Sequence, residues 1–264
     1  MYRLTRICLI ASATLSLLWF LACAPVTHPT AAPPAALPDD AASLLLIAEQ
    51  AYQFNGPPEA IARSLAAAEK LRRLEPDSER ANFLAARAVL WLEEFGGDSL
   101  DRRQLAETGY RYALAALAKN DKPAEYHFIA GALLGMQMEL ALVPKLSDLK
   151  TVYDHLSRAI ELDVSFEQGA PLRALGMLLI RAPAWPTGVG DPETGLEHLT
   201  RAAGLFPSFP ANCLYLAEGY LALDRPADAA APLQKARDLL AKEDWGTPGE
   251  VWRKQADKLA ARLR

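Results

Sequence analysis

A serine and a lysine one helical turn apart, Ser147 and Lys150, form the first pattern in the chain that could do chemistry. This S-x-x-K spacing places a hydroxyl nucleophile beside an amine, as in enzymes that pass through an acyl-serine intermediate. The companion triplets S-D-N and K-T-G do not occur in the sequence. Ser147 is also well placed to cap a helix, because its hydroxyl can accept a hydrogen bond from a free backbone N–H. We therefore expect a helix cap at Ser147 and no catalysis.

A glycine-rich stretch from Gly188 to Gly195 has the composition of a phosphate-binding loop. No strand pattern precedes it, no Gly-Lys-Ser/Thr follows it, and its spacing is not G-x-G-x-x-G. Asp191 as N-cap and Pro192 as the first helical residue account for the same sequence. The stretch therefore predicts the start of a helix and not a nucleotide site.

The histidines and cysteines are dispersed along the chain. His127, His155 and His198 fall on three separate expected helices, without the H-E-x-x-H spacing of zinc enzymes. The three cysteines include no C-x-x-C pair, and we expect Cys213 to be a small buried hydrophobe. We therefore expect no metal, no cofactor and no enzymatic activity.

Composition indicates a helical protein without a nucleic-acid partner. The 264 residues are 51% hydrophobic, enough for a sizeable core in one elongated array or two small domains. Alanine and leucine dominate, and β-branched residues are sparse, which disfavours strands. The formal net charge of −4, without a basic stripe, argues against binding to RNA or DNA.

Residues 1–22 have the layout of a secretory leader. Arg3 and Arg6 precede an apolar run that is too short for a comfortable membrane span. The run ends in Phe-Leu-Ala-Cys, which resembles a bacterial lipobox except for phenylalanine where leucine is usual. The resemblance implies cleavage before Cys23 and acylation of its thiol, which would anchor the chain firmly to a membrane. The alternative is an ordinary signal peptide with an incidental cysteine.

Residues 23–42 are rich in proline and alanine and should form an extended tether. In the bacterial lipoprotein pattern, alanine at position 24 favours the outer membrane. We therefore expect a lipoprotein that faces the periplasm, attached to the membrane through Cys23.

From Ser43 onward, the sequence reads as helices separated by turn residues. Their expected ranges are 44–54, 57–75, 78–95, 99–119, 123–142, 147–162, 166–181, 191–206, 210–223, 226–242 and 248–263. The last of these begins with Thr247, Pro248 and Glu250, which predict a capping box.

Two helices near the C-terminus repeat the same small–large–small pattern 34 residues apart (Gly195, Leu199 and Ala202, then Ala229, Leu233 and Ala236). Small residues at this spacing let a neighbouring helix approach, and a 34-residue period is typical of helix–turn–helix arrays. The stretch resembles a tetratricopeptide repeat (TPR). We predict an all-α, TPR-like right-handed solenoid over residues 43–264, with about five helical hairpins and a C-terminal capping helix.

An insertion at 182–191 interrupts the repeat: it adds nine residues to the 34-residue period. The insertion and the helix before it resemble the T component of TRAP-type periplasmic transporters (the TatT family). The matching motifs are R-x-L-G, A-P-x-W-P and G-D (Arg173, Leu175 and Gly176; Ala182, Pro183, Trp185 and Pro186; Gly190 and Asp191). The resemblance covers roughly residues 105–240. It implies a helical lipoprotein that associates with a periplasmic solute-binding protein and handles a hydrophobic ligand.

The alternative function is a general TPR scaffold for assembly of the cell envelope, and self-association into a homo-oligomer is left open. Long loops in repeat proteins are often functional, so we expect the insertion to make or border the binding surface. Trp185 would contact a partner or ligand, or else fill the gap made by its own loop. Arg173 and Arg181 would meet an acidic group of a partner, or pair with Asp191 or Glu193.

Overall fold

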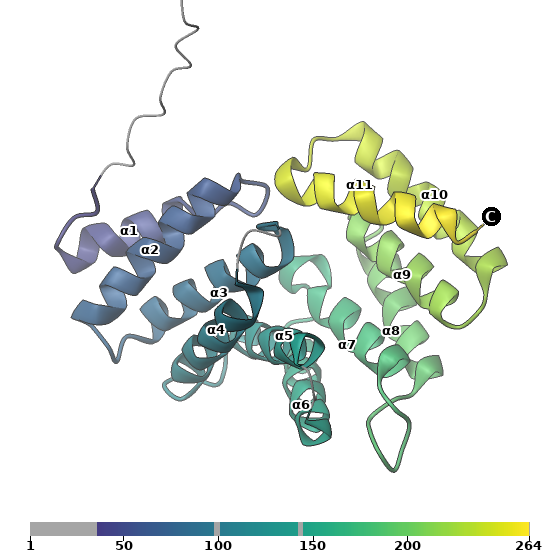
Figure 1. Ribbon diagram of the computed structural model, residues 1–264, viewed down its shortest axis with the longest axis horizontal. Helices are drawn as coiled ribbons and strands as arrows, with labels where there is room; N and C mark the ends of the chain where they lie inside the picture. The colour runs from purple at the N-terminus through teal and green to yellow at the C-terminus, as the bar shows by residue number, and fades with distance from the viewer. Residues whose placement is uncertain (1–35, 98–100, 142–144, 264) are drawn as a thin grey trace, which may run out of the picture. The chain divides into compact units, whose positions relative to one another are not determined.

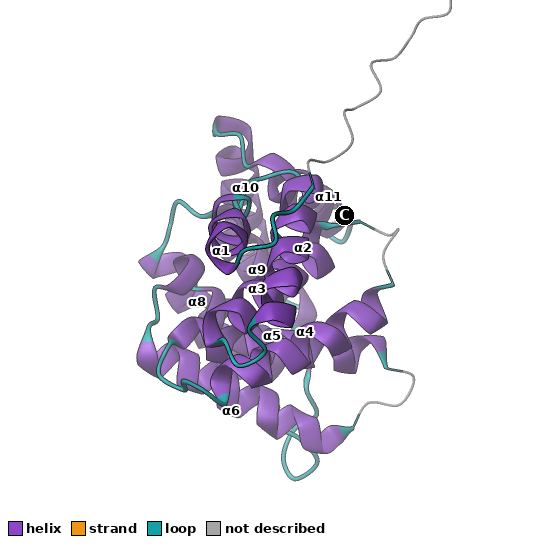
Figure 2. Cartoon of the chain, turned by 90° about the vertical axis from the view of Figure 1, so that its left-hand side faces the viewer, coloured by secondary structure: helices purple, strands orange, loops and turns teal. Residues whose placement is uncertain are grey.

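The computed structural model describes residues 36–97, 101–141 and 145–263. The predicted leader, Cys23 and most of the tether lie outside these residues. The described residues from Leu37 onward belong to one compact unit. They contain no strand (Figure 2) and no helix that is long and apolar enough to cross a membrane. The helices are α1 (Ala41–Gln50), α2 (Pro58–Leu74), α3 (Glu79–Phe95), α4 (Arg102–Leu117), α5 (Ala124–Leu140), α6 (Leu146–Leu162), α7 (Ala170–Arg181), α8 (Pro192–Leu205), α9 (Pro210–Ala222), α10 (Pro226–Lys242) and α11 (Gly246–Ala261).

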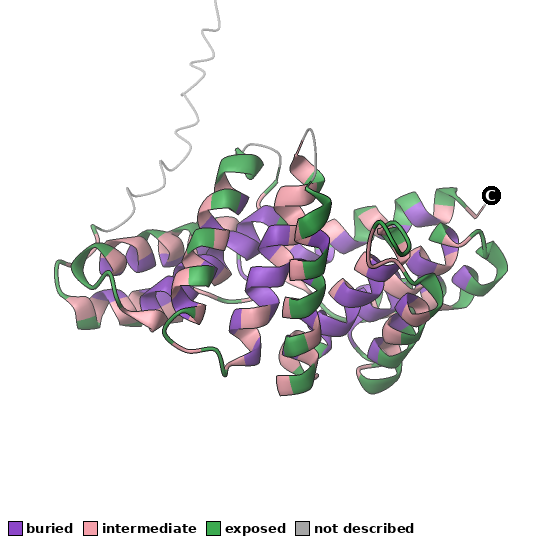
Figure 3. Ribbon diagram, turned by 90° about the horizontal axis from the view of Figure 1, so that it is seen from below, coloured by how far each residue is buried: buried purple, intermediate pink, exposed green. Residues whose placement is uncertain are grey.

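These helices pack as five consecutive hairpins, from α1/α2 to α9/α10, and α11 packs against the last of them (Figure 1). The odd-numbered helices α3, α5, α7 and α9 also contact one another in sequence, so they form the inner layer of the array. Buried residues lie mainly between the helices, and exposed residues lie on their outer sides (Figure 3). The predicted all-α, TPR-like solenoid with a capping helix is confirmed.

The repeated small–large–small positions lie on the seams between helices, as the pattern predicted. All six are buried (Gly195, Leu199, Ala202, Ala229, Leu233 and Ala236). The backbones of α7 and α8 approach each other closely. A Cβ placed on Gly176 would lie 2.8 Å from the carbonyl oxygen of Gly195. The absence of a side chain at both glycines therefore sets the spacing of this hairpin.

Two predicted caps are wrong. Helix α6 begins at Leu146, one residue before Ser147, and no side chain caps it. Helix α11 begins at Gly246, before Thr247, so the capping box does not form. The reason at α11 is a tighter turn upstream, where Asp244 accepts a hydrogen bond of 2.9 Å from the backbone N–H of Gly246.

The helix expected over 166–181 also begins later, at Ala170. Residues Phe166–Gln168 form a 3-10 turn in which Glu167 and Gln168 have positive φ angles of 41° and 53°. This left-handed backbone cannot continue an α-helix. The guanidinium of Arg173 stabilises the turn by donating to the carbonyl oxygens of Glu167 and Gln168.

An aromatic cluster joins the first and last parts of the array, and the sequence did not predict it. Trp252 of α11 packs with its ring centroid 6.1 Å from Phe54, 6.0 Å from Phe95 and 5.3 Å from Phe209. Helix α11 thereby contacts α3. Phe54 takes part because the first helix ends at Gln50, before the predicted residue 54, and the chain then turns inward.

Candidate functional site

A large groove has a volume of about 670 Å³, and we call it the inner groove. It lies between α5, α6 and α7 and is mostly apolar. Helices α5 and α7 touch each other only slightly, so α6, the second helix of its hairpin, supplies one wall. That wall consists of Leu149, Val152 and Leu156, whose spacing puts them on one face of the helix.

Small and flexible side chains make up the other walls. Gly135 of α5 leaves room in the groove, because an added Cβ would meet only Val152, at 3.9 Å. Gly131 lets α6 pack closely, because an added Cβ would lie 3.0 Å from Leu156. Met136, Met138 and Met177 also line the groove. Unbranched methionines adapt to ligands of different shape, so this lining suits an apolar ligand without a fixed outline. A volume of this size falls within the range of about 300–1,000 Å³ that is typical of small-molecule sites.

The N-terminal part of α7 lies at one end of the inner groove, and six polar residues lie near it. We call these six residues the polar floor (Tyr52, Arg87, Glu94, Glu167, Arg173 and Tyr215). Glu94, Arg173 and Tyr215 line both the groove and a smaller cavity of about 40 Å³, so the two spaces adjoin. The groove thus has an apolar body and a charged end, which is the arrangement that an amphipathic ligand requires.

The electrostatics of the polar floor are set by desolvation. Glu94 is exposed as a whole residue, but neighbouring side chains displace part of the water around its carboxyl. This desolvation raises the pKa of the Glu94 carboxyl to about 7, although Arg173 partly opposes the rise. The pKa of Glu167 is raised for the same reason. Burial lowers the pKa values of Arg87 and Arg173. It raises the pKa of Tyr215, whose hydroxyl therefore stays protonated.

Arg173, a predicted site residue, is 9% exposed and has a structural role as well. Its Nη1 donates to Oδ1 of Asn212 on α9 at 2.7 Å and to the carbonyl oxygen of Gln168 at 2.9 Å. The guanidinium also lies over the ring of Phe209 at 4.9 Å. It does not pair with Asp191 or Glu193, so that one of the two alternatives is wrong for Arg173.

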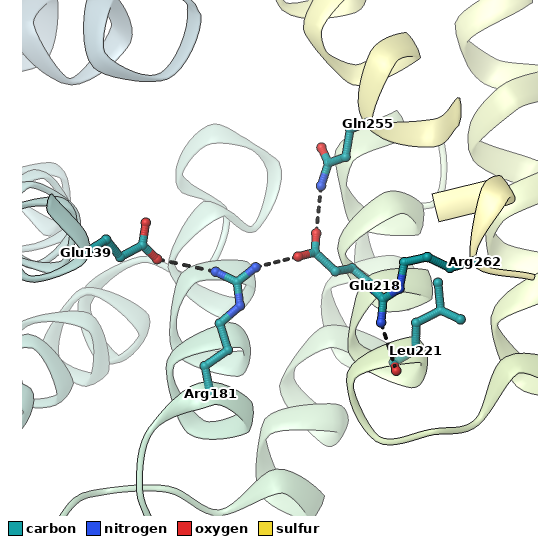
Figure 4. Close-up of polar contacts among 6 residues, drawn as sticks. All are labelled: Glu139, Arg181, Glu218, Leu221, Gln255 and Arg262. Carbon is teal, nitrogen blue, oxygen red and sulfur yellow. Dashed lines mark hydrogen bonds and ion pairs between the residues drawn. The ribbon is translucent and has the colours of Figure 1, made fainter. Parts of the chain in front are cut away.

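Arg181, the second predicted arginine, joins a chain of polar contacts across the inner helices (Figure 4). Its guanidinium forms ion pairs with Glu139 of α5, at 3.3 Å, and with Glu218 of α9. Glu218 in turn accepts a hydrogen bond of 2.7 Å from Nε2 of Gln255 on α11. All four residues line the inner groove, and Arg181 too does not pair with Asp191 or Glu193.

The inserted loop borders the inner groove. Ala182 and Pro183 line the groove, and a Cβ added to Gly188 would lie 3.3 Å from the side chain of Leu149. Trp185 is 85% exposed, so it does not fill the gap of its own loop, and it is not among the groove-lining residues. Asp191 is the N-cap of α8, as predicted: its carboxylate accepts from the backbone N–H of Thr194 at 3.1 Å and from its hydroxyl at 2.8 Å. These bonds lower the pKa of the Asp191 carboxyl.

The structure brings two of the three histidines together. Nδ1 of His127 lies 3.2 Å from Nδ1 of His155, while His198 lies on α8. Within the described ranges, no group of three or more histidine, cysteine or acidic side chains is arranged to hold a metal ion. Cys213 is buried in the core, and burial raises the pKa of its thiol.

The sequence reasoning missed five members of the polar floor: Tyr52, Arg87, Glu94, Glu167 and Tyr215. One pattern could have revealed two of them. Arg87 and Glu94 are seven residues apart in α3, a helix in which most positions are buried. Two charges on one face of such a helix indicate either an internal pair or a polar site.

Solved structures with the same arrangement of helices are TPR proteins. A thermophilic TPR protein from Thermus thermophilus aligns with a TM-score of 0.62 at 15% identity, over 85% of this chain and 99% of that chain. PilF of Pseudomonas aeruginosa gives 0.51 at 16% identity, over 84% and 90%. The MamA protein gives 0.50 at 13% identity, over 76% and 92%. The sequence matches no protein-family model and no curated protein. At these identities, the likeness establishes the fold.

Proposed function

We propose that the chain is a lipid-anchored accessory protein of the periplasm that docks a solute-binding protein of a TRAP-type transport system and handles a hydrophobic ligand. The observation that carries the proposal is the position of the inserted loop. It borders a large apolar groove and presents Trp185 to solvent beside it. An exposed tryptophan is costly to leave in water and is among the side chains that contribute most to protein interfaces.

The inner groove and the inserted loop suit two different kinds of binding partner. The inner groove has the volume and lining of a small-molecule site, whereas the loop offers a protruding aromatic side chain to a larger partner. The inner face of a TPR-like array is a natural surface for a partner, because stacked hairpins place successive inner helices side by side. Attachment through Cys23 would hold the protein at the outer membrane, where a soluble solute-binding protein can reach it.

The test is crosslinking of the full chain in membranes, followed by identification of the co-purifying protein and measurement of its affinity. We expect a TRAP-type solute-binding protein, and we expect Trp185→Ala to weaken its binding by at least about 1 kcal/mol. Leu74→Ala is the matched control, because Leu74 is a 50% exposed apolar residue on α2, away from loop and groove.

Three outcomes are informative. Weaker binding for Trp185→Ala and unchanged binding for Leu74→Ala support docking through the loop. Unchanged affinity in both variants removes the loop from the interface. Recovery of an envelope-assembly protein, with no solute-binding protein, would favour the alternative function, a general scaffold.

A further inference from the structure

We propose that the inner groove binds an alkyl monocarboxylic acid, with its carboxylate on the guanidinium of Arg87 at the polar floor and its alkyl chain along α5 and α6. The inference extends the ligand-handling part of the proposed function. Binding of the acid is measured without any partner protein, so the two proposals can fail separately.

Arg87 has unsatisfied hydrogen-bonding groups that a ligand could use. Among the described residues it forms no ion pair and no hydrogen bond, and its Nε is buried without a partner. Its contacts are with aromatic faces: the guanidinium carbon lies 3.8 Å from the ring centroid of Tyr52 and 5.4 Å from that of Phe83. Stacking of this kind leaves the N–H groups in the guanidinium plane unused. A partly buried cation without a counter-ion is costly, and a carboxylate would offset that cost with paired hydrogen bonds.

The neighbouring acids do not supply this counter-ion. Glu94 and Glu167 face the same cavity, but neither lies within ion-pair distance of Arg87. Desolvation raises the pKa values of both carboxyls, and that of Glu94 reaches about 7, so Glu94 is protonated for part of the time near neutral pH. Arg87 and Arg173 keep their charges under the same conditions. The floor therefore carries an excess of positive charge, which favours an anionic head group over a cationic one.

The size of the smaller cavity limits the head group. At about 40 Å³, it has room for roughly three water-sized spheres of ~15 Å³ each, which matches the three heavy atoms of a carboxylate. The hydroxyl of Tyr215 and the Glu94 carboxyl, when protonated, are further donors at the same place.

The apolar body of the groove fits the rest of such a ligand. From the floor, the space continues past Gly131 and Gly135 towards Leu146 and Pro183 at the other end. Gly135 and the methionines leave an open, adaptable channel. Each methylene group of the ligand that this channel removes from water contributes about 0.8 kcal/mol. Chain length should therefore raise affinity until the chain reaches the rim at Leu146, which is itself exposed.

The experiment is calorimetric titration of the full chain in phosphatidylcholine nanodiscs, with empty nanodiscs as the blank. The ligands are decanoic acid, decan-1-ol and decylamine, which share one alkyl chain and differ in the head group. We expect the acid to bind at least tenfold more tightly than the alcohol, and the amine to bind no more tightly than the alcohol. Equal affinities for acid and alcohol, tighter binding of the amine, or no binding of the acid would overturn the proposal.

Variants locate the head group. Arg87→Met keeps an unbranched side chain against Tyr52, and should reduce acid binding at least tenfold while leaving alcohol binding unchanged. Arg80→Met is the matched control from the same helix, because Arg80 pairs with Glu49 and does not line either cavity. Acid binding that survives in Arg87→Met contradicts the assignment. If Arg87→Met does not fold, the ratio of the affinities of the unaltered chain for the acid and the alcohol still tests the proposal.

Discussion

The contact between Gly176 and Gly195 allows a quantitative test of how the hairpins are packed. A methyl group added to Gly176 would lie 2.8 Å from the carbonyl oxygen of Gly195, and 2.8 Å from two carbon atoms of Leu199. Real Cβ atoms do not approach so closely, and one obstacle is backbone, which cannot rotate away. Gly176→Ala must therefore push α7 and α8 apart.

The expected effect is the balance of two terms. Overpacking costs about 1–3 kcal/mol, and we take the upper end, because a whole helix has to shift. Replacing glycine by alanine inside a helix contributes about 1 kcal/mol in the opposite direction. We therefore expect Gly176→Ala to lower the free energy of unfolding by about 2 kcal/mol.

Gly135→Ala is the matched control, because Gly135 is also a glycine inside an inner helix. Its added methyl group would meet only Val152, at an ordinary 3.9 Å. This variant should gain about 0.5–1 kcal/mol, since only the helix-propensity term remains. Urea unfolding followed by far-UV circular dichroism measures both variants. A Gly176→Ala protein that is as stable as the unaltered chain would refute the close packing of α7 against α8.

Four further predictions concern the seams, the aromatic cluster, the polar floor and the anchor. Ala202→Leu or Ala236→Leu should overpack a helix seam and lower the free energy of unfolding by about 1–3 kcal/mol; an unchanged melting midpoint would show the repeat register to be wrong. Trp252→Ala should cost about 3–5 kcal/mol in a urea titration, because the indole is buried among several rings. Since the pKa of Glu94 is raised in the folded state, its contribution to stability falls as pH rises from about 4.5 to about 7; Glu94→Gln should therefore raise the melting temperature at about pH 8 and change it little at about pH 4. Cys23→Ala should move the protein from the membrane fraction to the soluble periplasmic fraction, and retention in the membrane would contradict lipid attachment.

Local features were the part of the structure that could be predicted from sequence. The helices α9 and α10 begin and end within one residue of the expected positions, because proline, glycine and the small-residue pattern act over a few residues. Asp191 was correctly placed as an N-cap because its partner, Thr194, is three residues away.

Contacts between distant helices could not be predicted in the same way. One of the two alternatives for Arg181 was a pair with an acid near it in sequence, yet its partners Glu139 and Glu218 come from two other hairpins. The polar floor is assembled from α3, α7, α9 and the turns beside them, and no single stretch contains its pattern. Such a site depends on how the hairpins are stacked, which a period of 34 residues does not specify.

The packing of Trp252 against Phe54 has a consequence for how this protein could evolve. In an open repeat array each unit contacts only its neighbours, so whole repeats can be gained or lost with little effect on the others. Here Phe54 and Trp252 are about 200 positions apart in the sequence and still pack together. Their contact therefore requires a fixed number of hairpins between them. Deleting or duplicating one hairpin would separate the rings by the thickness of a helical layer, roughly 10 Å. We therefore expect the number of repeats in this protein to be constrained by selection, and insertions to be confined to loops such as 182–191.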